Sequence, residues 1–320
     1  MYLGIEIGGT KLQLGIGQGD GVIHALWRDT VVPAEGAEGI RRQIEKAVPE
    51  LLTQANLNRD QLQGVGIGFG GPVDDATRTV IKSHQIQGWD GFPLADWIAE
   101  LVGLPAVLGN DADVAGLAEA LFGAGKGMSP IFYITIGSGI GGGLIIEGEI
   151  YRGCGRGAAE IGHTKHPLRV NTLLHDHEPL EHAASGWGIA RLAEQLVVTE
   201  PCRSSVLADV SRRTGRISAE DVAKAATAGD VFAKSILDCA LDLLANGICN
   251  VIALLCPRRI IIGGGVSLMG DDLYFKPLRQ KTAARVFKPF ADCYDIVPAA
   301  LDEEVVVHGA LALARKRFLR

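Results

Sequence analysis

The sequence lacks several features that would assign it to a specialised class of protein. Its six cysteines are scattered without a C-x-x-C pair, which argues against a disulfide framework and is typical of reduced thiols in a cytoplasmic protein. No apolar run reaches 18 residues and no leader precedes the first apolar stretch, so we expect neither a membrane partner nor export. The formal net charge of -6 argues against a nucleic-acid partner, which would favour a basic face.

Glycine, in contrast, is abundant, with 42 residues, many of them in short clusters that follow apolar stretches. Such clusters indicate loops that meet a ligand closely, because glycine has no Cβ to hold the ligand away. The chain of 320 residues is 47% hydrophobic and 21% charged, as expected of a folded protein long enough for two lobes.

The periodicity of apolar residues predicts an α/β fold. Alternation over residues 2–27 predicts three antiparallel strands joined by glycine turns. Residues 182–255 are predicted to be mostly helical, with a polar, Arg-rich interruption near 203–216. Further strands are expected at 63–69, 105–110, 131–137 and 258–263, and further helices at 37–55, 93–103, 111–125, 273–286 and 303–318.

One internal similarity suggests that the two lobes are related. The stretch IEIGGTKLQLGI at 5–16 aligns with ITIGSGIGGGLI at 134–145, and both read as strand, glycine turn and strand. Each stretch also begins a run of strands that helices follow. We therefore expect two lobes that each open with a hairpin.

The glycines of the second hairpin also fit the dinucleotide fingerprint G-x-G-x-x-G, at Gly137, Gly139 and Gly142. That fingerprint requires a helix after the glycines, because the helix N-terminus holds the pyrophosphate. Here the β-branched stretch GGGLIIEGEIY follows, and a second match at 66–71 precedes Pro72. Neither context is that of a dehydrogenase.

A glycine turn inside a hairpin suits a different ligand. Its backbone N–H groups can face a phosphate and form an anion-binding concavity. Two such hairpins, with a third glycine turn in IIIGGGVS at 260–267, favour a polyphosphate ligand.

Several motifs together resemble the ROK family (repressors, open reading frames and kinases), of the sugar-kinase, heat-shock-protein and actin-like superfamily. The resemblance covers essentially the whole chain and rests on motifs in the family's order: IEIGGTK, GIGFGGPVD, GNDADVAGLAEALFGAGKG, TIGSGIGGGLIIEGEIYRG, AAEIGH and IIIGGGVS. It implies a two-lobed actin-like ATPase (ribonuclease H-like) fold, with a mixed sheet flanked by helices in each lobe. The expected lobes are 1–109, completed by a C-terminal helix at 303–320, and 110–302.

The resemblance also implies phosphoryl transfer from ATP with Mg²⁺, a reaction catalysed mainly by positioning and charge stabilisation. Glu6 stands where many relatives have an Asp that acts on the metal through water. An unpaired carboxylate between two isoleucines would be costly, which favours that role. The residues implied in nucleotide binding are Gly8, Gly9, Thr10 and Lys11 in the first turn, Gly137, Ser138 and Gly139 in the second, and Gly264 and Gly265 near the adenosine.

For the sugar, the resemblance implies that Asp111 is the general base that takes the proton from the acceptor hydroxyl. From spacing alone, Asp111 could equally be an acid that caps or begins a helix. The residues implied in sugar contacts are Asn110, Glu160, His163 and Glu181, with Gln85 where relatives often have Asn. Carboxylates and an imidazole suit the donors and acceptors of a sugar.

The sequence departs from the family most clearly after His163. Typical members carry C-x-C-G-x-x-G-C-x-E there, and its three cysteines bind zinc with the histidine. Residues 164–181 contain no cysteine, and the offsets of His166, His175, Asp176 and His177 do not match the missing ligands. We therefore expect no structural zinc. The Gln85 departure concerns the identity of the sugar, and Gly70 replaces a proline that many members have.

The leading interpretation is an ATP-dependent kinase that phosphorylates the 6-hydroxyl of a hexose, with glucose as the expected substrate. The alternatives are fructose or an N-acetylated amino sugar as acceptor, polyphosphate as donor, or a non-catalytic sugar-binding or regulatory ROK protein. Regulators carry an N-terminal helix-turn-helix, and only five residues precede Glu6 here, so we expect none. We also expect a homodimer or homotetramer, as in relatives.

Overall fold

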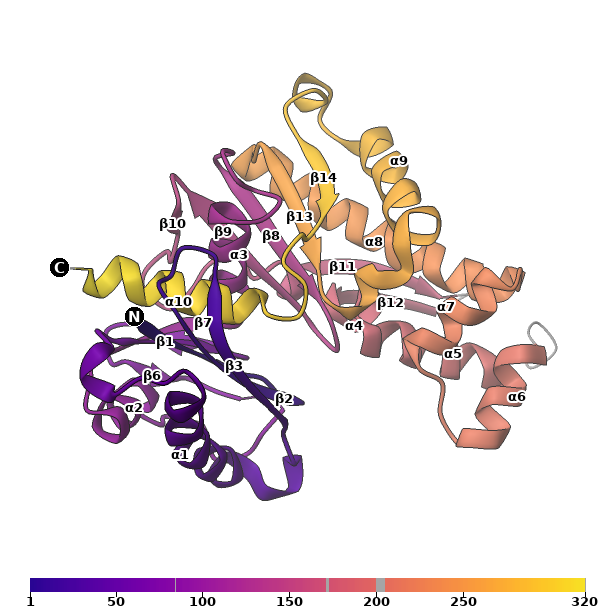
Figure 1. Ribbon diagram of the computed structural model, residues 1–320. Helices are drawn as coiled ribbons and strands as arrows, with labels where there is room; N and C mark the ends of the chain where they lie inside the picture. Colours follow the sequence, from indigo (N-terminus) through magenta and orange to yellow (C-terminus); the bar gives the residue numbers. More distant parts are fainter. Residues whose placement is uncertain (84, 171–172, 200–204, 320) are drawn as a thin grey trace. The chain divides into compact units, whose positions relative to one another are not determined.

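The computed structural model describes residues 1–83, 85–170, 173–199 and 205–319, with the backbone alone for 168–170, 173–177 and 205 (Figure 1). Its contacts divide the chain into two units. The first unit contains Met1–Tyr133, Gly143–Ala159 and Ala299–Arg320, and the second contains Ile134–Gly142 and Glu160–Pro298. The chain therefore passes from one unit to the other four times. Two of these passages lie inside strands, at 133/134 and 142/143, and two lie in loops, at 159/160 and 298/299.

The first unit is built on a five-stranded mixed sheet with the order β3-β2-β1-β4-β7. The antiparallel pairs β1·β2 and β2·β3 confirm the three strands expected at the N-terminus, and β4 and β7 extend the sheet in parallel. The strands are β1 (Tyr2–Ile7), β2 (Lys11–Gly17), β3 (Ile23–Thr30), β4 (Val65–Phe69) and β7 (Ala106–Asn110), and β5 (Val73–Asp74) and β6 (Thr79–Val80) form a separate short hairpin.

Four helices cover this sheet: α1 (Gly36–Gln54), α2 (Leu94–Val102), α3 (Asp111–Leu121) and α10 (Val305–Phe318). A row of paired glycines crosses the sheet under α10, with Gly4 opposite Gly15 and Gly66. A Cβ at Gly66 would lie only 1.9 Å from the carbonyl oxygen of Ala310. Some of the abundant glycine therefore serves helix-to-sheet packing and not ligand approach.

A second five-stranded sheet has the order β10-β9-β8-β13-β14. Its strands are β8 (Ile131–Ile136), β9 (Ile140–Ile146), β10 (Glu149–Ile150), β13 (Arg259–Gly263) and β14 (Asp295–Pro298). As in the first sheet, an antiparallel pair stands at one edge and a parallel pair at the other. The duplication suggested by residues 5–16 and 134–145 thus extends to the order of the strands.

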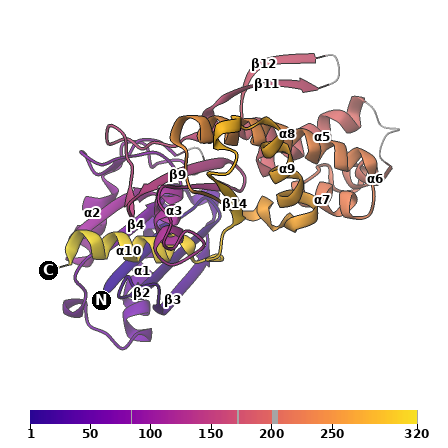
Figure 2. The ribbon, with the colours of Figure 1, turned by 90° about the horizontal axis from the view of Figure 1, so that it is seen from above.

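The second unit is rich in helices, which are α4 (Glu181–Ala184), α5 (Gly186–Thr199), α6 (Ser205–Thr214), α7 (Ala219–Thr227), α8 (Val231–Leu255) and α9 (Lys276–Arg285). The long helix α8 lies between α9 and the hairpin of β11 (Lys165–Val170) and β12 (Leu173–Pro179) in both views (Figures 1 and 2). By length and composition α8 could cross a membrane. Much of it is buried, however, as in the core helix of a globular unit.

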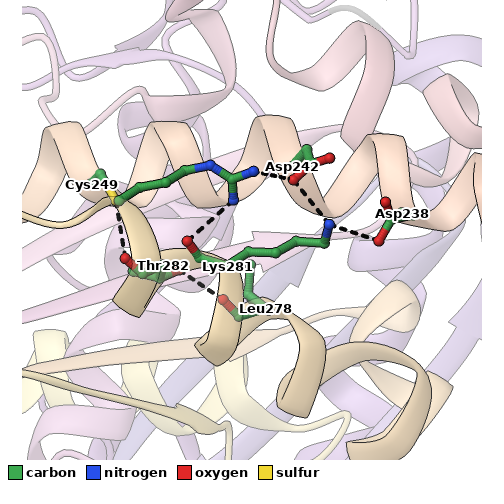
Figure 3. A network of polar contacts seen from close by, with 7 residues as sticks. Asp238, Asp242, Cys249, Leu278, Lys281 and Thr282 are labelled. Carbon is green, nitrogen blue, oxygen red and sulfur yellow. Dashed lines mark hydrogen bonds and ion pairs between the residues drawn. The ribbon is translucent and has the colours of Figure 1, made fainter.

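Charged side chains join α8 to α9 (Figure 3). The Lys281 ammonium lies 2.7 Å from Asp238 and 2.9 Å from Asp242, and Arg285 also pairs with Asp242. These partners lower the pKa of Asp242 against the opposing effect of its partial burial. The cluster ties the two helices together along the surface of the second unit.

The expected strands and helices are present, with three differences. Helix α6 occupies most of the stretch 203–216 that was expected to interrupt the helices. The hairpin β11–β12 was not foreseen, because its sequence KHPLRV…LLHDHEP has weak alternation. The units also differ from the expected lobes, since residues 110–133 group with the N-terminal sheet. The reason is that α3 packs against α10, which lies on that sheet.

The C-terminal end of α8 gives a prediction about stability. Cys256 follows the helix with φ 44° and ψ 54°, a left-handed conformation that favours glycine. Cys256→Gly is expected to raise the free energy of unfolding by about 1 kcal/mol, because the Cβ clash is removed. Denaturant unfolding would measure the change. Cys256→Ala is the control: it removes the thiol and keeps the strain, and equal stability of both variants would contradict the prediction.

Candidate functional site

The site residues expected from the sequence divide between the two units. In the first unit, β1 places Glu6 directly before the turn 8–10, and β2 begins at Lys11. The Lys11 ammonium lies 3.2 Å from Glu6 Oε1 and donates to the carbonyl of Glu303 at 2.8 Å. The Gly8 N–H is used by the turn itself, donating to the Lys11 carbonyl at 3.1 Å. Of the four nucleotide candidates here, Thr10 is the exposed one.

Glu6 is buried, with 5% of its surface exposed. Burial raises the pKa of Glu6 to about 7; Lys11 opposes the shift, and the carboxylates of Asp111 and Glu303 add to it. Its Oε2 atom is buried and has no hydrogen-bond partner among the residues described. A carboxylate oxygen left over in this way fits a hydrated cation, which is the role expected of Glu6.

Helix α3 places Asp111 at its first position. Asn110 is the N-cap: its Oδ1 accepts the N–H of Ala112 at 2.9 Å and of Asp113 at 3.3 Å, and its Nδ2 donates to the Gly71 carbonyl at 3.0 Å. The capping role that spacing alone allowed for Asp111 is therefore filled by Asn110. The half-buried Asp111 accepts the Ala112 N–H at 2.8 Å and lies where the helix dipole favours an anion.

Gln85 lies over the first glycine turn. A Cβ added to Gly9 would fall 1.5 Å from Gln85 Oε1, so the absence of a side chain at Gly9 makes room for this amide. A small cavity of the first unit is lined here by Ile7, Gly8, Gly9, Phe69, Gly70, Ser83, Gln85, Ile86 and Trp89. Gly70 is also close to Asp111, whose Oδ2 would lie 3.5 Å from a Cβ at that position. The first unit thus brings Gly8, Gly9, Gln85 and Asp111 near one another.

In the second unit, the turn 137–139 is held by the start of α5. Gly186 donates its N–H to the Gly137 carbonyl at 2.8 Å, and Trp187 donates to the Ser138 carbonyl at 3.4 Å. The N–H of Gly137 bonds the Gly139 carbonyl at 3.0 Å. No atom would lie within 4 Å of a Cβ at Gly137, so the side of the turn at this residue is open.

Gly264 and Gly265 follow β13 in the same unit. Gly264 has φ 86°, and a Cβ there would lie 2.5 Å from the carbonyl oxygen of Ile136, so glycine is required. Ser267 fixes the turn by donating its hydroxyl to the Gly264 carbonyl at 2.7 Å. Gly186 connects the two nucleotide candidates, because its Cβ position is 2.9 Å from the Gly137 oxygen and 3.5 Å from Val266.

Three sugar candidates belong to the second unit. Glu160 precedes a short turn, Ile161–His163, that ends with the exposed His163. Partial desolvation of its carboxyl raises the pKa of Glu160; His163 opposes the shift and the nearby Glu181 carboxylate adds to it. Glu181 begins α4 and accepts the Ile140 N–H at 3.4 Å. Electrostatics therefore couple Glu160, His163 and Glu181 as a group.

The region of the family's zinc ligands has a different arrangement. His166 is buried and its ring contacts the Thr164 hydroxyl at 2.9 Å; burial lowers the pKa of His166. The side chains of His175, Asp176 and His177 lie outside the described residues. Among the side chains that are described, no group of three His, Cys, Asp or Glu is arranged to hold a metal. The absence of a structural zinc stays a prediction.

The sequence reasoning missed two residues that organise the site. Gly186 holds the turn 137–139, and the pair Ser185–Gly186 after a short helix is a signal that could have pointed to it. Glu119 is fully buried on α3 and accepts the N–H groups of Ala124, Ala300 and Leu301 at 2.7–2.9 Å. It fixes the segment that leads into α10, and its helical position gave no sequence signal.

Comparison with known proteins gives matches along the whole chain. The model of the ROK family matches residues 2–317. The glucokinase of Halalkalibacterium halodurans is 33% identical, with 99% of this chain and 95% of the relative covered. The glucokinase of Thermotoga maritima is 31% identical, with 99% and 98% covered.

Among solved structures, a ROK family glucokinase from Streptomyces griseus in complex with glucose and AMPPNP matches with a TM-score of 0.78. It is 31% identical, and the match covers 98% of this chain and 99% of the other. The likeness agrees with the two mixed sheets flanked by helices and shows the actin-like ATPase fold expected from the sequence.

Proposed function

We propose that this chain, which belongs to the ROK family, is an ATP-dependent hexose kinase that phosphorylates the 6-hydroxyl of glucose. The observation that carries the proposal is the start of α3. Asn110 caps the helix there, and Asp111 places a half-buried carboxylate at the first helical position, where the helix dipole favours an anion. The likeness to glucokinases at 31–33% identity supports glucose as the acceptor.

In the proposed reaction, Asp111 accepts the proton of the sugar hydroxyl as that oxygen attacks the γ-phosphorus of ATP. The bond from this phosphorus to the β,γ-bridging oxygen breaks, and ADP leaves. Glu160, His163 and Glu181 bind the other hydroxyls and orient the sugar. Partial burial raises the pKa of Glu160, and its two carboxylate oxygens can accept hydrogen bonds from the sugar hydroxyls. Exclusion of water would favour transfer over hydrolysis.

The glycine turns would position the nucleotide. The open side of Gly137 leaves room for a phosphate against the backbone, and Gly264 and Gly265 would approach the adenosine. Lys11 provides a positive charge beside the first turn. Mg²⁺ bound with ATP would neutralise phosphate charge, and the unpartnered Oε2 of Glu6 fits a water of its hydration shell.

The direct test is phosphoryl transfer by the purified, chelator-treated protein with Mg-ATP. ADP release would be followed with glucose, fructose, N-acetylglucosamine, N-acetylmannosamine and no sugar, and polyphosphate would replace ATP in a parallel series. We expect turnover that depends on glucose. Turnover with another hexose would change the substrate, and none with any acceptor or donor would favour a non-catalytic binding protein.

A second test concerns the phosphate turn. Gly137→Ala is expected to raise the KM for ATP about tenfold, because the new methyl group occupies space that a phosphate would use. It should leave thermal stability unchanged, since no protein atom lies within 4 Å of the added Cβ. Gly139→Ala is the comparison, because its Cβ would lie 2.9 Å from Glu181 Oε2 and disturb the protein itself. An unchanged KM for ATP in Gly137→Ala would place the phosphates elsewhere.

A cytoplasmic location and assembly as a homodimer or homotetramer belong to the same proposal. Cell fractionation and sedimentation analysis would test them independently of activity.

A further inference from the structure

The turn 137–139 is bound by one continuous segment, residues 181–187. Gly186 and Trp187 donate to the carbonyls of Gly137 and Ser138, and the Glu181 carboxylate accepts the Ile140 N–H on the other side of the turn. A Cβ on Gly139 would be only 2.9 Å from Glu181 Oε2. The carboxylate therefore packs directly against the turn, and its position and that of the turn are linked.

We propose that Glu181 is a positioning residue for the phosphate turn, in addition to its expected contact with the sugar. The inference rests on the proposed function, which makes 137–139 a phosphate site. Glu181 has two carboxylate oxygens, and Oε2 is the one directed at the turn. Oε1 can accept a sugar hydroxyl while Oε2 keeps its bond to the Ile140 N–H.

This arrangement couples the two substrates. A bound sugar would fix the Glu181 side chain and, through it, the turn. A nucleotide that then orders the turn costs less conformational entropy than it would without sugar. Nucleotide binding is then tighter with sugar present, and by linkage the sugar binds more tightly with nucleotide present by the same factor. The hydrogen bond from Ile140 to Glu181 carries this coupling.

Two substitutions separate the hydrogen bond from the charge. Glu181→Asp keeps the negative charge and withdraws the acceptor by one methylene, so the Ile140 N–H loses its partner. Glu181→Gln removes the charge and keeps an oxygen acceptor at the same reach. A simple charge effect would make nucleotide binding tighter in the Gln variant and leave the Asp variant unchanged, whereas a positioning role weakens binding in the Asp variant.

The experiment is calorimetric binding of AMPPNP to the full-length protein without sugar, repeated with saturating glucose. Without sugar, Glu181→Asp is expected to bind AMPPNP roughly two- to tenfold more weakly, the net contribution of one hydrogen bond. Glu181→Gln should bind AMPPNP at least as tightly as the original protein. The control is Glu220→Asp, at an exposed acid of α7 that pairs with Lys224 in a helical i,i+4 bridge.

The outcomes distinguish this inference from the proposed function. AMPPNP binding by Glu181→Asp that equals that of the original protein without sugar would overturn the positioning role, even if hexose phosphorylation is demonstrated. Weaker binding with an unchanged melting temperature supports it. Absence of hexose phosphorylation in the original protein would remove the proposed function, and the sugar-free binding measurement would still decide the role of Glu181.

Discussion

Asp111→Asn is expected to lower kcat for hexose phosphorylation by a factor of about 100 to 10,000, which is the usual contribution of a positioned general base. The amide has the shape of the carboxylate but cannot take up the proton of the attacking hydroxyl. The fold should be retained, because Asn110 provides the helix cap and Asn is tolerated at a helix start. Steady-state kinetics with Mg-ATP and glucose, together with thermal unfolding, would measure both effects.

The matched control is Asn110→Ala at the preceding position. It removes the acceptor for the N–H groups of Ala112 and Asp113 and is expected to cost about 0.5–2 kcal/mol of stability. Because Asn110 is also an expected sugar contact, the two variants are compared by thermal unfolding: loss of the cap should lower stability in Asn110→Ala and not in Asp111→Asn. Retention of more than a tenth of kcat by Asp111→Asn would contradict the assignment of Asp111 as base, and a large loss of stability in that variant would favour a structural role.

Much of the fold could be predicted because its signals are local. The alternation over residues 2–27 and the glycine turns specify the first hairpins, and the similarity of 5–16 to 134–145 predicted a second hairpin of the same kind. The shared order of strands in the two sheets is a finding of the structure. The helix expected at 93–103 is present as α2, and Gly103 ends it in the left-handed conformation that glycine favours. Short-range patterns of this kind need no knowledge of the tertiary structure.

The remaining features depend on contacts between segments that are distant in sequence. Spacing alone allowed Asp111 to cap or to begin a helix, and the structure gives the cap to Asn110 and the first helical position to Asp111. The contact of Gly186 with the turn at Gly137 joins positions 49 residues apart, and the carboxylate of Glu119 reaches a segment 181–182 residues away. Neither separation leaves a periodic signal.

Glu6→Gln is expected to have opposite effects on stability and activity. Burial raises the pKa of Glu6 from 4.5 to about 7, so the folded protein holds a proton there that the unfolded chain releases above pH 4.5. Stability therefore falls as the pH rises between these two values, since one pKa unit corresponds to about 1.4 kcal/mol. Gln is neutral, so without divalent cations the variant should be more stable by about 1–3 kcal/mol at pH 8 and similar to the original protein at pH 4.

The same substitution removes the negative charge that attracts Mg²⁺ and replaces one of the two carboxylate oxygens by an amide nitrogen, so kcat/KM with Mg-ATP should fall about 10- to 100-fold, as for other residues that act on a metal through water. Denaturant unfolding at several pH values in chelator, and kinetics over a range of Mg²⁺ concentrations, would measure the two effects. Glu303→Gln is the control, because its side chain is 76% exposed and its backbone carbonyl, which Lys11 contacts, is unaffected. Its carboxylate is the smallest of the named contributions to the raised pKa of Glu6, so its loss should change stability much less than Glu6→Gln does. If Glu6→Gln is more stable but less active, the buried carboxylate lowers the stability of the fold and is needed for activity with Mg²⁺. Stability of the original protein that does not vary between pH 4.5 and 8 would contradict the raised pKa, and full activity of the variant would exclude Glu6 from the metal site.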